Sequence, residues 1–240
     1  MDLAAKPPFL QDRFLQGRPN QDRPTQDRPN AARWMTLAFI VAALCAVAVL
    51  AAVGTGERGT DDALQATGRV SFLLFWPAYV GGALVTLFGP AFQPVRRRGR
   101  EFGLAFASAQ TVHMGLVAWL CWIGATPVMG VFVFFGIALI CMYLLALCSI
   151  ARVRRAVGPI GWRILQVFGM NYIAYAFATD FLKFQHDGTV KFALAYLPFA
   201  ALSLVGPALV LAALAMRTAR ARWPGGPALL ARPRRHPAPR

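Results

Sequence analysis

Six apolar stretches, each about twenty residues long or slightly longer, dominate the 240-residue chain. A helix of that length, at about 1.5 Å per residue, crosses the ~30 Å hydrocarbon layer of a bilayer. Lipid offers no hydrogen-bond partner to backbone amides, so each stretch must be an α-helix. The sequence therefore predicts an all-α fold, a polytopic membrane protein with a six-transmembrane-helix bundle. The expected spans are 34–54, 70–92, 102–124, 128–151, 162–183 and 191–216.

The segments on either side of this bundle are polar. Residues 1–33 contain a five-residue QDRPN-like repeat with too little apolar surface to offset the entropy of ordering, so we expect a disordered tail. Residues 217–240, rich in Pro, Arg and Ala, are expected to form a second, basic disordered tail. The bundle, 34–216, then leaves no soluble catalytic domain. No GxGxxG opens a βαβ unit and no Walker motif occurs, so no nucleotide-binding domain is expected in this chain.

The positive charge of the chain, formally +15, is unevenly distributed. Of 25 Lys and Arg residues, six lie in 1–33, four in 93–101, four in 151–163 and seven from Arg217 onward. Cytoplasmic loops carry such an excess, so both termini are expected in the cytoplasm and the protein in the inner (plasma) membrane. The same distribution accounts for the charge without a nucleic-acid partner, and the expected partner surface is the lipid bilayer.

The four cysteines, Cys45, Cys121, Cys141 and Cys148, all lie in expected spans, and none forms a CxxC pair. They are therefore interpreted as small apolar residues, and neither a disulfide framework nor a zinc site is expected.

The third expected span contains His113 near its middle and Gln110 three residues earlier, on the same helical face. His113 lies roughly 16 Å from the cytoplasmic end of the span, close to the bilayer midplane. A polar side chain at that depth is costly and therefore marks a candidate functional site. A neutral imidazole there is a good axial ligand for haem iron. A hydrogen bond across a helix interface explains the residue equally well.

The fifth expected span also carries polar side chains. Asn171 and Tyr175 are four residues apart, share a face, and lie at about the depth of His113. Span five is therefore the expected neighbour of span three across the bundle. Asp180 lies nearer the outer end, where the simpler interpretation is a solvated helix terminus.

Two segments, PVRRRGREFGLAFASAQTVHMGLVAWL and GWRILQVFGMNYIAYAF, resemble the ferric reductase-like transmembrane domain. This family includes the haem-binding membrane subunit of the bacterial methionine sulfoxide reductase system. The shared pattern is a basic loop, a Leu-Gly-Leu-like opening and a histidine, here Arg96 to Arg100, Phe102-Gly103-Leu104 and His113. The likeness covers roughly residues 70–216. It implies haem b held between histidines on two helices, with His113 as one iron ligand.

The chain departs from the family pattern in span five. Gln166 and Thr179 stand where the family usually has histidines. The resemblance thus implies one haem on His113, opposite a vacant or weak position, or a haem that has been lost. Met170 could supply a thioether, and Tyr172 or Tyr175 an oxygen. The candidate cofactor-binding residues are therefore His113, Gln110, Gln166, Met170 and Tyr172, with His113 as the candidate metal ligand.

Two function hypotheses follow from these patterns. The first is a haem b-binding subunit for transmembrane electron transfer, part of an oxidoreductase that works with a separate redox partner protein. The second is a haem-free membrane scaffold or partner subunit that kept the fold and lost the cofactor. A transporter is less favoured, because the spans show neither an inverted repeat nor a facing pair of charges.

Overall fold

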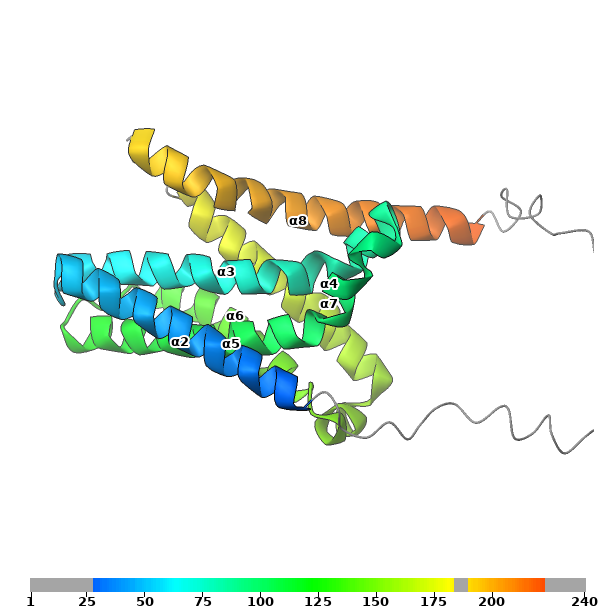
Figure 1. Ribbon diagram of the computed structural model, residues 1–240, viewed down its shortest axis with the longest axis horizontal. Helices are drawn as coiled ribbons and strands as arrows, with labels where there is room; N and C mark the ends of the chain where they lie inside the picture. The colour runs from blue at the N-terminus through cyan, green and yellow to red at the C-terminus, as the bar shows by residue number, and fades with distance from the viewer. Residues whose placement is uncertain (1–27, 184–189, 223–240) are drawn as a thin grey trace, which may run out of the picture.

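The computed structural model describes residues 28–183 and 190–222, and within these ranges the secondary structure is helical, without strands. Long helices run back and forth along one axis and form a bundle (Figure 1). The elements are α2 (Arg28–Val53), α3 (Glu57–Phe88), the 3₁₀ turn η2 (Pro90–Phe92), α4 (Gln93–Arg97), α5 (Gly99–Trp122), α6 (Met129–Leu147), α7 (Ala151–Lys183) and α8 (Val190–Arg222).

Five of the described helices, α2, α3, α5, α6 and α8, are long and apolar enough to cross a membrane. The chain is therefore an all-helical, multi-pass membrane protein, as the sequence predicted. α7, which contains the expected fifth span, is not among the five, because arginines and polar residues interrupt its apolar sequence. It nevertheless runs obliquely along the bundle from the end of α6 toward the start of α8 (Figure 1). The count of six spans remains a prediction.

Several helices extend beyond the expected apolar stretches. α3 begins at Glu57, although the expected span begins at 70, and α7 begins at Ala151, although the expected span begins at 162. Hydropathy marks where lipid contact ends, whereas the backbone hydrogen bonds of a helix continue into polar sequence, which explains why the helices are longer than the expected spans.

The bounds of the two expected tails also differ from the prediction. Residues 28–33 belong to α2 and residues 217–222 to α8, while 1–27 and 223–240 lie outside the described residues.

α3 lies at the centre of the bundle and packs against α2, α5 and α8, while α7 packs against α6 and α8. Where α2 meets α5, the buried side chains are alanines, Ala38 and Ala42 on one helix and Ala105 and Ala109 on the other. Small side chains let helices approach closely, which is how membrane helices gain van der Waals contact in the absence of a hydrophobic driving force. The outer face of α2 instead exposes large apolar side chains suited to lipid.

An aromatic cluster joins α3, α5, α7 and α8. The ring of Phe72 contacts Phe177 and Phe181 edge-on, at centroid separations of 5.2 and 5.0 Å. Phe106 of α5 lies 5.4 Å from Phe75 and 6.0 Å from Phe177. Edge-to-face and offset ring contacts add to the apolar burial and fix the relative position of the helices.

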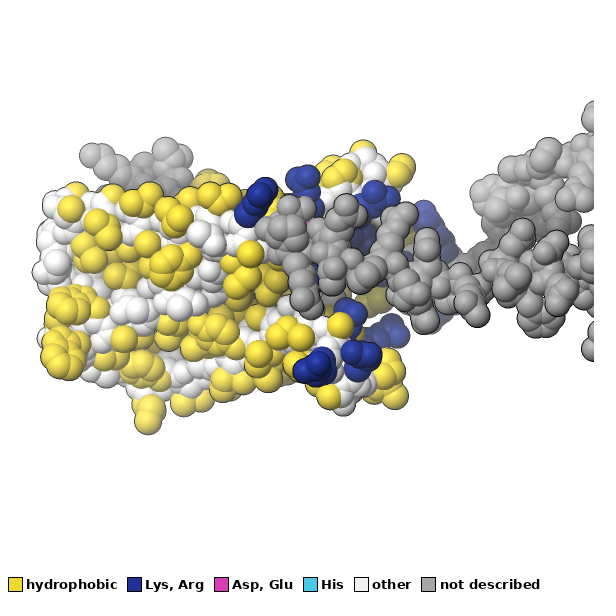
Figure 2. Space-filling view, turned by 60° about the horizontal axis from the view of Figure 1, so that its bottom comes forward, with side chains coloured by type: hydrophobic (Ala, Val, Ile, Leu, Met, Phe, Trp, Pro, Cys, Tyr) yellow, Lys and Arg dark blue, Asp and Glu magenta, His cyan; other side chains and the backbone are white. Residues whose placement is uncertain are grey.

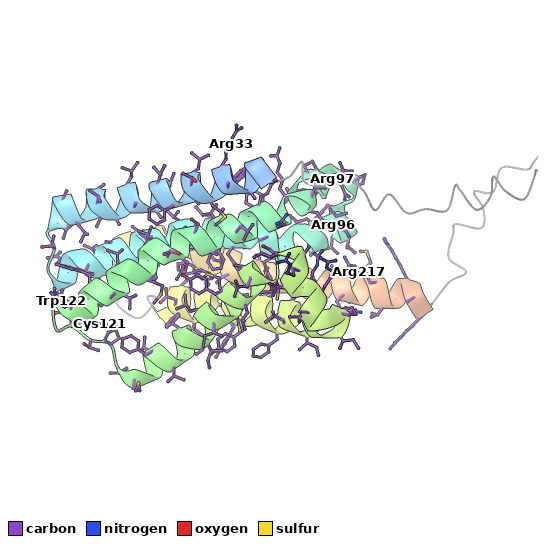
Figure 3. The ribbon with its side chains drawn as sticks, turned by 90° about the horizontal axis from the view of Figure 1, so that it is seen from below. Arg33, Arg96, Arg97, Cys121, Trp122 and Arg217 are labelled. Atoms are coloured by element: carbon purple, nitrogen blue, oxygen red, sulfur yellow. The ribbon has the colours of Figure 1, made fainter. Side chains whose placement is uncertain are left out.

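The two ends of the bundle differ in charge. Arg96, Arg97 and Arg217 lie at one end, and Cys121 and Trp122 lie at the other (Figure 3). Figure 2 shows the Lys and Arg side chains of its visible face gathered at one end, beyond a surface covered by hydrophobic side chains. α2 begins and α8 ends at this arginine-rich end (Figure 1). This separation of charge is the one that the sequence predicted.

Candidate ligand-binding cavities

Two cavities lie among α3, α5, α6 and α7. The first, here called the His113 cavity, has a volume of about 560 Å³. The second, the arginine cavity, has a volume of about 980 Å³ and is nearer the arginine-rich end. Phe106, Met142 and Ile173 line both cavities and form the wall between them. The cavities exist because α5 packs on α2 and α3, whereas α7 packs on α6 and α8.

The His113 cavity contains an imidazole whose orientation is set by α3. The Nδ1 atom of His113 lies 3.0 Å from the hydroxyl oxygen of Thr67. That hydroxyl is also 2.8 Å from the carbonyl oxygen of Ala63 and 3.1 Å from that of Leu64, one turn earlier in the same helix. Thr67 is fully buried, so no water competes for these bonds.

The geometry around Thr67 favours one tautomer of His113. A threonine hydroxyl has one proton, and here it is donated to a backbone carbonyl of α3. The oxygen can then only accept from the ring, so Nδ1 carries the imidazole proton. In a neutral imidazole the other nitrogen, Nε2, then has a free lone pair. This is the arrangement that a histidine needs in order to ligate a metal, with its second nitrogen held by a hydrogen bond.

The rest of the His113 cavity is mainly apolar. Gly68 lies beside the imidazole, and a Cβ atom at that position would make an ordinary van der Waals contact with Cε1 of His113, at 3.8 Å. The side-chain oxygen of Gln110 is buried and has no hydrogen-bond partner within the described part of the chain. Aromatic and thioether side chains supply most of the remaining wall: Phe106, Phe132, Phe135, Phe177, Met114 and Met142.

One end of the His113 cavity is polar. Asp61 and Gln65 of α3 and Asp180 of α7 line it there. Beside it, the guanidinium of Arg69 lies 4.2 Å above the ring of Tyr196, whose hydroxyl donates to Gln65. A cation over an aromatic face is a favourable way to hold an arginine in an apolar setting. Asp180 is thus part of the cavity wall, whereas the sequence favoured a solvated helix end.

The expected site residues divide between the two cavities. Gln110 and His113 share the His113 cavity, as their spacing predicted. Gln166 and Met170 line the arginine cavity instead. Tyr172 lies in neither: its hydroxyl donates to the carbonyl of Phe134 at 3.1 Å.

α7 presents a different face to α5 from the one expected. Asn171 bonds to the hydroxyl of Tyr79 at 2.9 Å, and Tyr175 is 58% exposed. The α7 residues that reach the His113 cavity are Ile173, Ala176, Phe177 and Asp180. A polar side chain on a membrane helix can hydrogen-bond to any neighbouring helix. The depth of Asn171 and Tyr175 in the membrane therefore did not identify the side of α7 that faces α5.

Sequence reasoning missed Thr67, the residue that orients His113. A signal was present, because Thr60, Thr67 and Ser71 are spaced seven and four residues apart and therefore lie on one face of α3. All three are fully buried. A row of hydroxyl residues on one side of an apolar helix is the feature that could have indicated it.

Among the described residues, no group of three or more His, Cys, Asp and Glu side chains is placed to hold a metal ion. The four cysteines are free; Cys141 and Cys148 are buried, whereas Cys45 and Cys121 are partly exposed. A haem iron needs only one or two axial ligands from the protein, so His113 remains the candidate.

None of the known protein-family models, curated proteins or solved structures with which we compared the chain matches it. The resemblance to the ferric reductase-like domain therefore rests on the two sequence segments alone.

Proposed function

We propose that the chain is a membrane subunit for transmembrane electron transfer and holds one haem b in the His113 cavity, with Nε2 of His113 as an axial ligand. The observation that carries this proposal is that His113 lines a cavity while its Nδ1 atom lies 3.0 Å from the hydroxyl of Thr67. A histidine that only joins two helices and a histidine that ligates a metal would each make this hydrogen bond, so the bond alone does not separate the two roles. What favours a ligand is that the free nitrogen belongs to a side chain lining a cavity.

The residues of the His113 cavity fit such a group. Its volume of about 560 Å³ is within the ~300–1,000 Å³ of typical small-molecule sites. His113 would ligate, Thr67 would keep the ring in place, and Phe135 and Phe177 would pack against an apolar macrocycle. When bound, haem supplies reversible one-electron transfer at its iron, tuned by the axial ligand and by burial. The chain supplies binding, orientation and exclusion of water.

The proposed topology follows from the charges and the course of the helices. With α7 as the fifth of six spans, the start of α2 and the end of α8 would lie on the same side of the membrane. The arginine-rich end would face the cytoplasm, in a plasma membrane. Electrons would come from a separate redox partner protein, since no GxGxxG of this sequence opens a βαβ unit and no Walker motif occurs.

Two observations favour a second candidate, a haem-free membrane scaffold. Gln166 and Met170 line the arginine cavity, so neither lies opposite His113. Asp61 and Asp180 line the His113 cavity, and carboxyl groups repel the anionic propionates of haem. In this alternative His113 only joins α5 to α3, and the bundle serves a partner protein.

A difference spectrum decides between the two candidates. The protein would be expressed with haem supplied, purified in detergent and recorded as dithionite-reduced minus oxidised. We expect Soret and α bands in the wild type and their loss in His113→Ala. Colourless wild-type protein, still folded by circular dichroism, would establish the scaffold alternative instead.

A matched pair of glycine variants tests the location of the haem. Gly136 of α6 lines the His113 cavity, and a Cβ there meets nothing within 4 Å, so Gly136→Leu should fill the cavity without a backbone clash. Gly115 of α5 is exposed and has equally open surroundings. We expect Gly136→Leu to lose the bands and Gly115→Leu to keep them. Equal bands in both variants would place the haem elsewhere.

A further inference from the structure

The geometry points to a lipid site: the arginine cavity binds one anionic glycerophospholipid, with its phosphate on Arg96, Arg100 and Arg154 and its acyl chains in the apolar interior. This inference is independent of the proposed haem site, because it uses a different cavity and different residues.

The charge of the arginine cavity is the first argument. Its three arginines come from three elements, α4, α5 and α7, and converge on one space. None of the described residues that line this space is an Asp or a Glu, so the charge is not balanced from within the cavity. Guanidinium groups form paired hydrogen bonds to phosphate oxygens, which makes a phosphate a well-matched counterpart.

The local backbone brings these arginines together. Gly81 of α3 lies against α4, and a Cβ atom there would come within 3.3 Å of Cα of Arg96. In α7, Gly158 has φ 76°, a left-handed conformation that favours glycine, and Pro159 follows it. The helix breaks at this point. Arg154 lines the cavity from before the break, and Trp162 from after it.

The interior of the cavity is the second argument. Beyond the arginines, its wall is made by apolar side chains, among them Phe75, Leu104, Phe106, Met142 and Leu145. A free phosphate would satisfy the arginines but would leave this apolar space, part of about 980 Å³, unfilled. An amphipathic molecule with an anionic head and an apolar body matches both parts.

The position of the cavity selects a lipid as the source of that molecule. The arginines lie where α4 and the first turns of α5 and α7 meet, at the end of the bundle that carries most of the positive charge. If this end is cytoplasmic, it lies at the level of the headgroups of the inner leaflet, where anionic lipids are abundant. Trp162, which also lines the cavity, belongs to a residue type enriched at that interface.

Native mass spectrometry of the full chain in detergent tests the inference, with phosphatidylglycerol and phosphatidylcholine as probes. We expect one tightly bound phosphatidylglycerol and only weak binding of phosphatidylcholine.

Each arginine near an anionic headgroup contributes about fivefold in affinity, so Arg96→Gln, Arg100→Gln and Arg154→Gln together should weaken binding on the order of 100-fold. The control variant combines Arg97→Gln, Arg98→Gln and Arg155→Gln, which removes the same charge from exposed arginines outside the cavity. Equal losses in the two triple variants would overturn the inference, because the binding would then follow net charge alone.

A second pair of variants tests the apolar half of the site and leaves every arginine in place. Gly103 lines the arginine cavity, and a Cβ there meets nothing within 4 Å, so Gly103→Leu should occupy the space of the acyl chains. We expect Gly103→Leu to lose the lipid and Gly115→Leu to retain it.

Glycerol 3-phosphate is the probe for a free phosphate. If it competes as well as phosphatidylglycerol and Gly103→Leu has no effect, the cavity is an anion site and the lipid inference is wrong. A wild-type haem spectrum in the variant that loses lipid would show that the two sites are separate.

Discussion

The hydroxyl of Thr67 and the Nδ1 atom of His113 lie 3.0 Å apart and join α3 to α5 in the interior of the bundle. The proton of that hydroxyl is engaged by the backbone of α3, so Thr67 accepts from the imidazole. This bond favours the tautomer of His113 that carries its proton on Nδ1 and leaves the Nε2 lone pair for another partner.

Replacing Thr67 with valine, which has the same shape but no hydroxyl, should release the imidazole. A residue that orients a metal ligand typically contributes 10–100-fold in affinity, and we expect Thr67→Val to weaken haem binding by about this factor. Haem titration followed by the Soret band measures it. Thr67→Ser keeps the hydroxyl and should bind nearly as the wild type does. If valine and serine variants bind haem equally, Thr67 does not position His113.

The first turn of α3 should tolerate no side chain at Gly59. A Cβ atom there would lie 1.9 Å from the carbonyl oxygen of Gly54, which is backbone and cannot rotate away. We expect Gly59→Ala to destabilise the fold by about 1–3 kcal/mol or more, as overpacking does. The measurement is thermal unfolding in detergent. Gly115→Ala, at an exposed site with open space around it, is the control and should unfold near the wild-type temperature.

Trp76 should stabilise the contact between α3 and α8. Its indole N–H donates to the carbonyl of Leu202 at 3.0 Å. Trp76→Phe leaves that carbonyl without this donor, and we expect a loss of about 1–3 kcal/mol in unfolding free energy. Trp122→Phe removes the same group from a side chain that is 83% exposed. A loss in Trp122→Phe as large as that in Trp76→Phe would show that the bond to Leu202 is not the cause.

Labelling of single cysteines in intact cells should show whether α7 crosses the membrane. In a variant whose four native cysteines are replaced by alanine, an impermeant maleimide should label Thr126→Cys, in the loop between α5 and α6. Ala156→Cys and Thr218→Cys should be labelled only after the cells are opened, because six spans return the end of α8 to the cytoplasm. If Thr218→Cys reacts in intact cells and Ala156→Cys does not, α7 does not cross.

The helical class and the difference in charge between the two ends of the bundle were predictable from sequence. Both depend on which residue types each segment contains, because apolar segments enter the bilayer and Lys and Arg stay outside it. The pairing of Gln110 with His113 was predictable because three residues in a helix always return to nearly the same face. Both residues do line one cavity.

The side of α7 that faces His113 was not predictable, because it depends on partners far away in the chain. Asn171 is satisfied by Tyr79 of α3, ninety-two residues earlier, and Tyr175 on the same face of α7 is exposed. Gln166 and Met170 are then directed to the arginine cavity. A single sequence shows that these residues are polar or apolar, but it does not show which neighbouring helix they hydrogen-bond to or pack against.

The shared wall of Phe106, Met142 and Ile173 has a consequence for how the two cavities respond to their contents. A molecule that displaces any of these three side chains changes the volume left on the other side. By linkage, whatever the first occupant does to the affinity for the second, the second does equally to the first. Filling one cavity would then change the space available in the other through these three side chains, without any contact to the imidazole.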